Sequence, residues 1–322
     1  MVILEDLGKS SLEALTHTEN LAEYIQQQLA QPYPLRQHLY YNSPSIGATL
    51  FNDHAQSVDE LLKQADIAMY QAKKAGRNTL RFFDPAMQET INARAALEAA
   101  LRQALAEEGL QLYYQVQMDE HCRPIGAEVL IRWSHPERGL ISPGDFIPLA
   151  EETDLILPIG QWVLEQACQE LARWSQRPET RDLKLAVNVS AKQFRRPDFV
   201  AQVQAAVTRH DIDATRLKLE LTESMLLENM EQTIATMRAL RAIGVKLSLD
   251  DFGTGYSSLQ YLKHLPLDQI KIDQSFVRDL VSNPSDLAIV RTIIAMADGL
   301  HLNVIAEGVE TNEQRDTLLE LG

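Results

Sequence analysis

From residue 110 onward the chain repeats one pattern, a short β-prone run followed in most cases by a stretch long enough for a helix. Seven such runs occur, at residues 111–117, 125–133, 183–189, 217–221, 245–249, 269–272 and 303–306. Strands that alternate with helices favour a parallel sheet, either closed as a (β/α) barrel or open and doubly wound. The helical pattern that continues to Gly322 favours an α/β, TIM-like (β/α)8 barrel that stops before its last strand. The doubly wound sheet is the alternative.

The first part of the chain has a different pattern of β-prone and helical segments, which predicts a smaller, partial α+β unit. Its expected elements are a strand at residues 2–4, a helix at 21–29, a hairpin of two short strands at 40–50 and an amphipathic helix at 58–74. Asp84 precedes Pro85 and closes this unit, because a residue before proline avoids the helical region. We therefore expect a first domain at residues 1–84, a linker helix at 85–108 and the barrel at 109–322.

Composition excludes several broad classes of protein. A net charge of −15 and a pI near 5.0 argue against a binder of nucleic acid polymers or of membrane surfaces. No apolar stretch approaches the roughly 20 residues that span a bilayer, so we expect no membrane segment. Two cysteines, Cys122 and Cys168, are too few for a disulfide framework. The chain is therefore expected in the reducing cytoplasm.

Acidic, amide or basic side chains stand at or near the carboxyl ends of six of the seven runs. They are Glu128 and Arg132, Asn188, Glu220 with Glu223 behind it, Asp250 and Asp251, Lys271, and Glu307 with Glu310 behind it. In a (β/α) barrel these strand ends and their loops converge on one face, which is the active face. The sequence therefore predicts that these side chains form one site.

The chemistry of this set indicates a metal site. Asp250 and Asp251 are adjacent and repel each other when ionised, which a fold tolerates mainly where a cation offsets the repulsion. Carboxylate and amide oxygens without histidine or cysteine favour Mg²⁺ or Mn²⁺. The acids suffice for two ions, the arrangement that clamps both oxygens in phosphodiester cleavage. Phosphoryl chemistry is favoured, and Mg²⁺-assisted enolate formation with Lys271 as base is an alternative.

Six ordered segments resemble the signature of the EAL-domain family. They are EVLIRW at 128–133, NVS at 188–190, ELTES at 220–224, DDFGTG at 250–255, KID at 271–273 and IAEGVE at 305–310. The resemblance runs from about Arg94 to Gly322. It implies a phosphodiesterase that hydrolyses the bacterial second messenger cyclic di-GMP to linear pGpG.

The first unit resembles the C-terminal half of a GGDEF (diguanylate cyclase) domain. The similar segments are SIGA at 45–48, ADIAMY at 65–70 and AKKAGRN at 72–78, and residues 2–6 match the strand after that family's signature turn. The turn itself, which carries the metal and catalytic residues, is not in this sequence. We therefore expect no cyclase activity.

The EAL resemblance also implies roles for individual residues. The first metal would be held by Glu128, Asn188, Glu220 and Asp250, and a second by Asp250 and Asp251, both ions being Mg²⁺ or Mn²⁺. Lys271 would position the attacking water, and Glu307 would act as general base. Arg132 would hold a substrate phosphate, and Gln115 a guanine.

Two acids have roles outside the metal set. Glu223 would hold the loop at residues 252–258, through which the family implies a homodimer, and Glu310 would lie behind or beside the metals.

Three departures from the family pattern bear on these expectations. Val129 stands where the family has its name-giving alanine, and Val116 where it usually has proline. The chain ends before the family's last strand, so we expect an incomplete barrel. The sequence is compatible with a longer parent that has sensory or membrane domains upstream. An inactive receptor that binds cyclic di-GMP is the alternative to a working enzyme.

Overall fold

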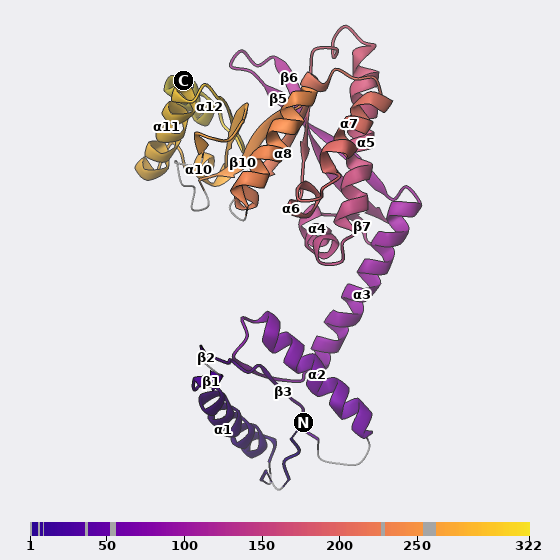
Figure 1. Cartoon of the computed structure of the whole chain (residues 1–322), viewed down its shortest axis with the longest axis vertical. Helices are drawn as coiled ribbons and strands as arrows, with labels where there is room; N and C mark the ends of the chain where they lie inside the picture. The colour runs from indigo at the N-terminus through magenta and orange to yellow at the C-terminus, as the bar shows by residue number, and fades with distance from the viewer. Residues whose placement is uncertain are drawn as a thin grey trace. The chain divides into compact units, whose positions relative to one another are not determined.

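The structure is a computed structural model that describes residues 2–5, 7–8, 10–35, 38–51, 56–226, 229–253 and 262–322 (Figure 1). The chain divides into two compact units, Met1–Leu97 and Glu98–Gly322. Each is described by itself. Among the described residues, none of the helices combines the length and the apolar character that crossing a membrane requires.

The first unit is a small α+β arrangement. It contains α1 (Ser11–Leu29), β1 (Tyr33–Leu35), β2 (His38–Tyr40), β3 (Ile46–Ala48), α2 (Val58–Lys74), β4 (Leu80–Phe82) and the first part of α3 (Pro85–Ala106). Ser57 caps α2 by accepting a hydrogen bond from the backbone N–H of Glu60, and Lys73 and Lys74 lie in its last turn. Gly47 lets α2 lie against β3, since a Cβ there would be 2.1 Å from the carbonyl oxygen of Ala65.

Two expectations for this unit were wrong. The antiparallel hairpin is β1–β2 rather than residues 40–50, and β3 pairs in parallel with β4, more than 30 residues later. A short β-prone run does not specify its partner strand. The position of β3 is set by its close contact with α2. Residues 2–4 form no strand among the described residues, and Val2 and Ile3 are exposed.

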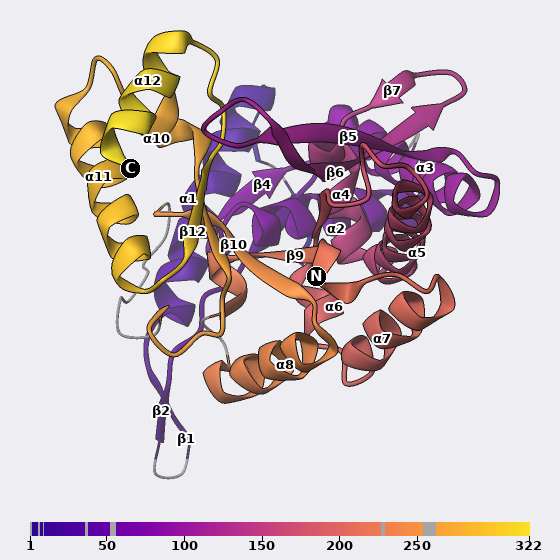
Figure 2. The ribbon, with the colours of Figure 1, turned by 90° about the horizontal axis from the view of Figure 1, so that it is seen from above.

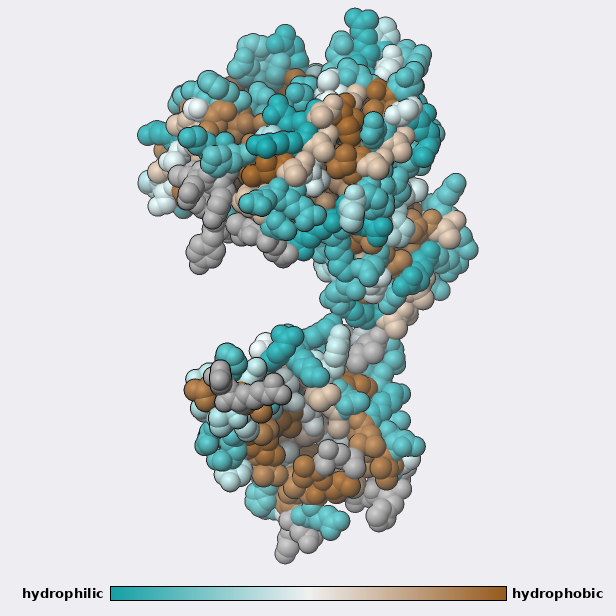
Figure 3. Space-filling view, in the orientation of Figure 1, coloured by the Kyte–Doolittle hydropathy of each residue, from teal (hydrophilic) through white to brown (hydrophobic). Residues whose placement is uncertain are grey.

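The first unit buries little apolar surface. Ala22, Ala68 and Ala72 are the only apolar side chains that are fully buried in its described part. Figure 3 shows brown, apolar side chains gathered on the visible face of this unit. Leu39 and Tyr41 are among the exposed large apolar residues of the unit. Burial of apolar side chains, the main stabilising contribution to folding, is therefore concentrated in the second unit.

The second unit is built on one curved sheet. Its strands are β5 (Leu110–Met118), β6 (Pro124–His135), β7 (Gly139–Ile141), β8 (Lys184–Asn188), β9 (Leu217–Thr222), β10 (Lys246–Phe252), β11 (Gln269–Ile272) and β12 (Asn303–Ala306). They lie in the order β12-β11-β10-β9-β8-β6-β5, with β7 beside β6. Neighbouring strands along β6-β8-β9-β10-β11-β12 are parallel, as the alternation of strands and helices predicts, and β7 pairs with β6 in the antiparallel direction. The β5–β6 pair is antiparallel, because only five residues separate the two strands.

Helices cover the outer side of this sheet (Figure 2). They are α4 (Pro143–Glu152), α5 (Ile156–Ser175), α6 (Ala191–Phe194), α7 (Phe199–Arg209), α8 (Met230–Ile243), α10 (Gln274–Arg278), α11 (Pro284–Gly299) and α12 (Asn312–Leu321). Strand β9 shows how the sheet sorts its side chains. Leu217, Leu219 and Leu221 are buried on the face toward the helices, and the alternate residues Lys218 and Glu220 point to the concave side.

Candidate active site

The parallel register brings the predicted polar residues to one edge of the sheet. Asn188 lies beside Glu220, Glu220 beside Ser248 two positions before Asp250, and Lys271 beside Ile305 two positions before Glu307. Glu128 lies beside Ala186, two positions before Asn188. All these strands point the same way, so their carboxyl ends form one polar cluster.

Lys271 occupies the centre of this cluster. Its ammonium nitrogen Nζ lies 2.7 Å from Glu220, 3.0 Å from Glu128, 3.1 Å from Asp250 and 2.5 Å from Glu307. The side chains of Lys271 and Glu220 are 2% and 0% exposed. One buried cation therefore contacts carboxylates contributed by four different strands or the residue directly after one.

Asn188 completes the ring on the β6 side. Its amide nitrogen Nδ2 donates a 2.8 Å hydrogen bond to Glu128, so its amide oxygen is directed away from that contact. Ser190 then caps α6 in a capping box with Gln193, which stops the chain from continuing as a strand. Gly160 on α5 makes room for this box, since a Cβ there would lie 1.8 Å from Nε2 of Gln193.

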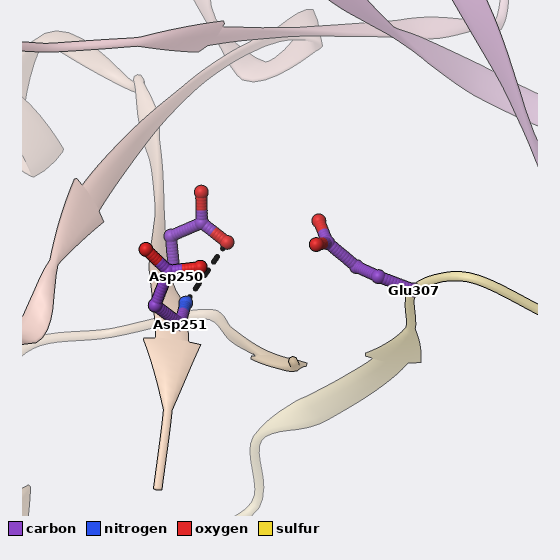
Figure 4. Close-up of side chains that lie close together, drawn as sticks. All are labelled: Asp250, Asp251 and Glu307. Atoms are coloured by element: carbon purple, nitrogen blue, oxygen red, sulfur yellow. Dashed lines mark hydrogen bonds between the residues drawn. The ribbon is translucent and has the colours of Figure 1, made fainter. Parts of the chain in front are cut away.

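Asp250, Asp251 and Glu307 form a compact group of carboxylates (Figure 4). One oxygen from each lies within 4.8 Å of the others, and the side chains of Asp250 and Glu307 point toward each other. Asp251 adopts φ 55°, the left-handed region that aspartate tolerates better than most residues. Its backbone N–H donates to Oδ1 of Asp250 at 3.0 Å.

The electrostatics of the site reflect an excess of carboxylates. Burial raises the pKa of Glu220 to about 7, with Glu128 and Asp250 adding to the shift and Lys271 opposing it. Burial also raises the pKa of Glu307 against the effect of Lys271. Burial also raises the pKa of Asp251, and the charges of Asp250 and Asp273 raise it further. The single ammonium of Lys271 therefore does not offset burial at Glu220 and Glu307.

The residues present fit a divalent cation. Oε1 of Glu220 is buried and has no hydrogen-bond partner among the described residues, which costs free energy unless a ligand supplies one. Burial and neighbouring carboxylates raise the pKa values of Glu220 and Glu307, and a bound cation would oppose both effects. An all-oxygen donor set of acids and one amide suits Mg²⁺ or Mn²⁺.

The remaining candidates lie around this cluster. Glu223 is buried, and its Oε2 accepts a 3.4 Å hydrogen bond from the backbone N–H of Gly253, directly before residues 254–261, which lie outside the described ones. Glu310 is exposed before α12, where its backbone N–H donates to Gln314, and it takes no part in the ion pairs around Lys271. Gln115 pairs in register with Glu128, and Arg132 lies further along the same face of β6.

Sequence reasoning gave no role to Asp273, which follows β11. The interaction of its carboxyl group with that of Asp251 lowers the pKa of Asp273 and raises that of Asp251. Asp273 also caps α10 by accepting from the backbone N–H of Ser275. Its position two residues after Lys271 was the available signal, because that spacing puts it at the same edge of the sheet.

Residues 98–322 match the family model for the EAL domain. The chain belongs to the EAL-domain family. Residues 1–79 match the model of the diguanylate cyclase GGDEF domain. Both resemblances that the sequence motifs indicated are confirmed.

Two curated relatives come from Pseudomonas aeruginosa. The bifunctional diguanylate cyclase/cyclic di-GMP phosphodiesterase MucR is 43% identical over 303 residues, which cover 94% of this chain and 44% of MucR. The cyclic di-GMP phosphodiesterase NbdA is 40% identical over 93% of this chain and 38% of its own length. The chain thus spans less than half of each of these relatives.

A solved structure of the PaMucR phosphodiesterase in complex with c-di-GMP is also similar to this EAL domain. It is 44% identical, with a TM-score of 0.68 over 70% of this chain and 92% of the solved chain. The likeness confirms the expected barrel-type fold, here as a curved half-barrel sheet, with a GGDEF fragment at the N-terminus.

Proposed function

We propose that this EAL domain hydrolyses cyclic di-GMP to linear pGpG in a reaction that depends on two Mg²⁺ or Mn²⁺ ions. The observation that carries the proposal is the cluster around Lys271, in which Glu128, Glu220, Asp250 and Glu307 all contact one buried ammonium. The names of MucR, NbdA and the PaMucR complex support the choice of substrate.

The metal ligands follow from the donor set. Glu128, Asn188, Glu220 and Asp250 would hold one ion, and Asp250 with Asp251 a second, next to Glu307. When bound, the ions supply Lewis-acid stabilisation of the phosphate oxygens and a water of lowered pKa.

Two residues of the chain handle the proton and the developing charge. The product pGpG requires that a water oxygen bonds to phosphorus while the bond from phosphorus to a ribose 3′ oxygen breaks. The 3′ oxygen then takes up a proton from solvent and leaves as a hydroxyl group. Glu307, whose pKa burial raises, takes the proton of the water. Lys271 stays protonated, because its carboxylate neighbours outweigh burial and raise its pKa, and it orients the water and offsets negative charge on the phosphate.

Arg132 and Gln115 bind the rest of the substrate. Arg132 presents a guanidinium fork that matches a phosphate, and Gln115 offers both an amide donor and an acceptor to the edge of a guanine. Both lie on the Glu128 face of the β5–β6 pair.

The decisive experiment incubates the purified chain with cyclic di-GMP and Mg²⁺ or Mn²⁺, with EDTA as the control, and separates the products by chromatography. We expect pGpG to appear with metal and not with EDTA, and Asp250→Ala to abolish it. Cyclic di-GMP binding without metal-dependent pGpG would instead support the inactive receptor. No binding at all would refute both.

Two further expectations stay predictions. A homodimer through the loop after Asp251 involves residues outside the described ones. The domain limits at residues 84 and 108 lie on either side of the division between Leu97 and Glu98.

A further inference from the structure

Among the described residues, Arg132 at the site has no ion-pair partner. Its Nη1 donates a 2.9 Å hydrogen bond to the carbonyl oxygen of Ile131, its own neighbour in β6. Among the described residues no carboxylate forms a salt bridge with it, although the site is rich in acids. A long side chain that must present its guanidinium to a phosphate loses rotamer freedom on binding unless something else already holds it.

The phenol ring of Tyr113 lies where it can hold this side chain. The guanidinium carbon of Arg132 is 5.6 Å from the centroid of the Tyr113 ring. Tyr113 pairs in register with Leu130, and Gln115 with Glu128, so Tyr113 lies on the same face of the sheet as Glu128 and Arg132. The ring is half-exposed and open to a ligand from solvent.

We infer that Tyr113 is a positioning residue that holds Arg132 in place for a substrate phosphate. A ring face attracts a guanidinium without using its N–H groups, so the donor fork remains available for an anion. A carboxylate in the same place would occupy the fork and cancel its charge. The inference rests on the proposed function, in which Arg132 contacts cyclic di-GMP.

The neighbouring Tyr114 provides a matched control. It has the same side chain and similar exposure, but points to the opposite face of β5, where its ring lies 6.2 Å from that of Trp174 on α5. A change at Tyr114 therefore removes a ring from the same strand without touching Arg132.

The test compares kinetics of Tyr113→Leu, Tyr113→Phe and Tyr114→Leu with the wild-type chain. We expect Tyr113→Leu to raise KM for cyclic di-GMP about five-fold, the effect of one exposed cation–π contact, with kcat nearly unchanged. Tyr113→Phe keeps the ring and should keep KM, and Tyr114→Leu should leave both constants unchanged. Equal KM values for wild type and Tyr113→Leu would overturn the inference.

A double variant separates positioning from direct contact. If Tyr113 acts through Arg132, Tyr113→Leu should add nothing to the loss caused by Arg132→Met. Additive losses would mean that the ring touches the substrate itself, which also overturns the inference. A wild-type chain that binds but does not hydrolyse allows the same comparison by dissociation constants. A wild-type chain that neither binds nor hydrolyses refutes the proposed function and the inference with it.

Discussion

The ammonium nitrogen of Lys271 lies 2.7 Å from a carboxylate oxygen of Glu220, and both side chains are withdrawn from solvent. Removing one partner of a buried ion pair leaves the other charge without compensation. We expect Lys271→Met to lower the free energy of unfolding in EDTA by about 3–5 kcal/mol and to reduce hydrolysis at least about 10²-fold. Urea unfolding and product formation measure the two effects. Lys63→Met, on the exposed face of α2, should change neither.

Divalent cations should stabilise the second unit. A cation at about 100 times its dissociation constant adds roughly 2.7 kcal/mol to the free energy of unfolding, which raises Tm by roughly 5–10 °C in a unit of this size. Scanning calorimetry with Mg²⁺ and with EDTA measures the difference. Asp250→Asn should remove most of the shift, and a shift of equal size in that variant would contradict the ligand assignment.

We expect Asp251 to lower the stability of the metal-free chain although hydrolysis requires it. Its φ of 55° and the repulsion that raises its pKa beside Asp250 both cost stability in the absence of metal. Asp251→Asn suits the same backbone and removes the charge, so we expect a gain of about 1 kcal/mol in EDTA together with loss of hydrolysis. Asp211→Asn is the control, because Asp211 has φ 49° but is exposed. A destabilised Asp251→Asn would contradict the predicted repulsion between Asp250 and Asp251.

Glu165 on α5 should make the second unit sensitive to acid. It contacts Arg209, and its Oε2 lies 2.9 Å from Nε2 of His210. Burial raises its pKa, but these two partners outweigh burial and lower it. The contribution to stability is therefore complete above the pKa of the unfolded carboxyl, about 4.3, and is lost as pH falls through the lower folded pKa.

Glu165→Gln tests this dependence. We expect its unfolding free energy to fall less steeply than that of the wild type as pH decreases below about 5. Glu179→Gln, in an exposed loop after α5, should follow the wild-type curve. Parallel curves for wild type and Glu165→Gln would contradict the prediction.

Lys218 is a buried cation that the proposed chemistry does not use. Its Nζ donates a 2.6 Å hydrogen bond to Gln269, a neutral partner, and burial lowers its pKa to about 8. We expect Lys218→Met to raise the free energy of unfolding at pH 7 by about 1–3 kcal/mol. The unfolded lysine binds a proton more tightly than the folded one, so wild-type stability rises between pH 8 and about 10.4, and the advantage of the variant shrinks there. If the gain in unfolding free energy of Lys218→Met did not depend on pH, the lowered pKa of Lys218 would be excluded as its cause.

The strand ends could be predicted from the sequence because polar residues follow apolar runs at the places where parallel strands must end together. Asn188, Glu220 and Lys271 were identified in that way, and the register brings them to one edge. The contacts between them could not be predicted. That Lys271 joins four acids depends on side-chain directions from four strands, and the approach of Tyr113 to Arg132 depends on the antiparallel register of β5 and β6.

The errors in the first unit have a different origin. A run of β-prone residues indicates a strand but carries no information on its partner, so β3 was placed in a hairpin with its neighbour. Residues 2–4 show the opposite error, since a β-prone run forms no strand where no partner bonds to it.

The absent side chain at Gly160 bears on how relatives of this domain are judged. Its space is filled by the amide of Gln193, which closes the turn two residues after Asn188. A bulkier residue at position 160 would displace that amide and shift Asn188, a proposed metal ligand, while every acidic residue of the site stays the same. A homologue that keeps every acid could therefore be catalytically inactive because of a bulkier residue at this position on an outer helix. Sorting such homologues into enzymes and receptors requires inspection of this packing position as well as of the ligands.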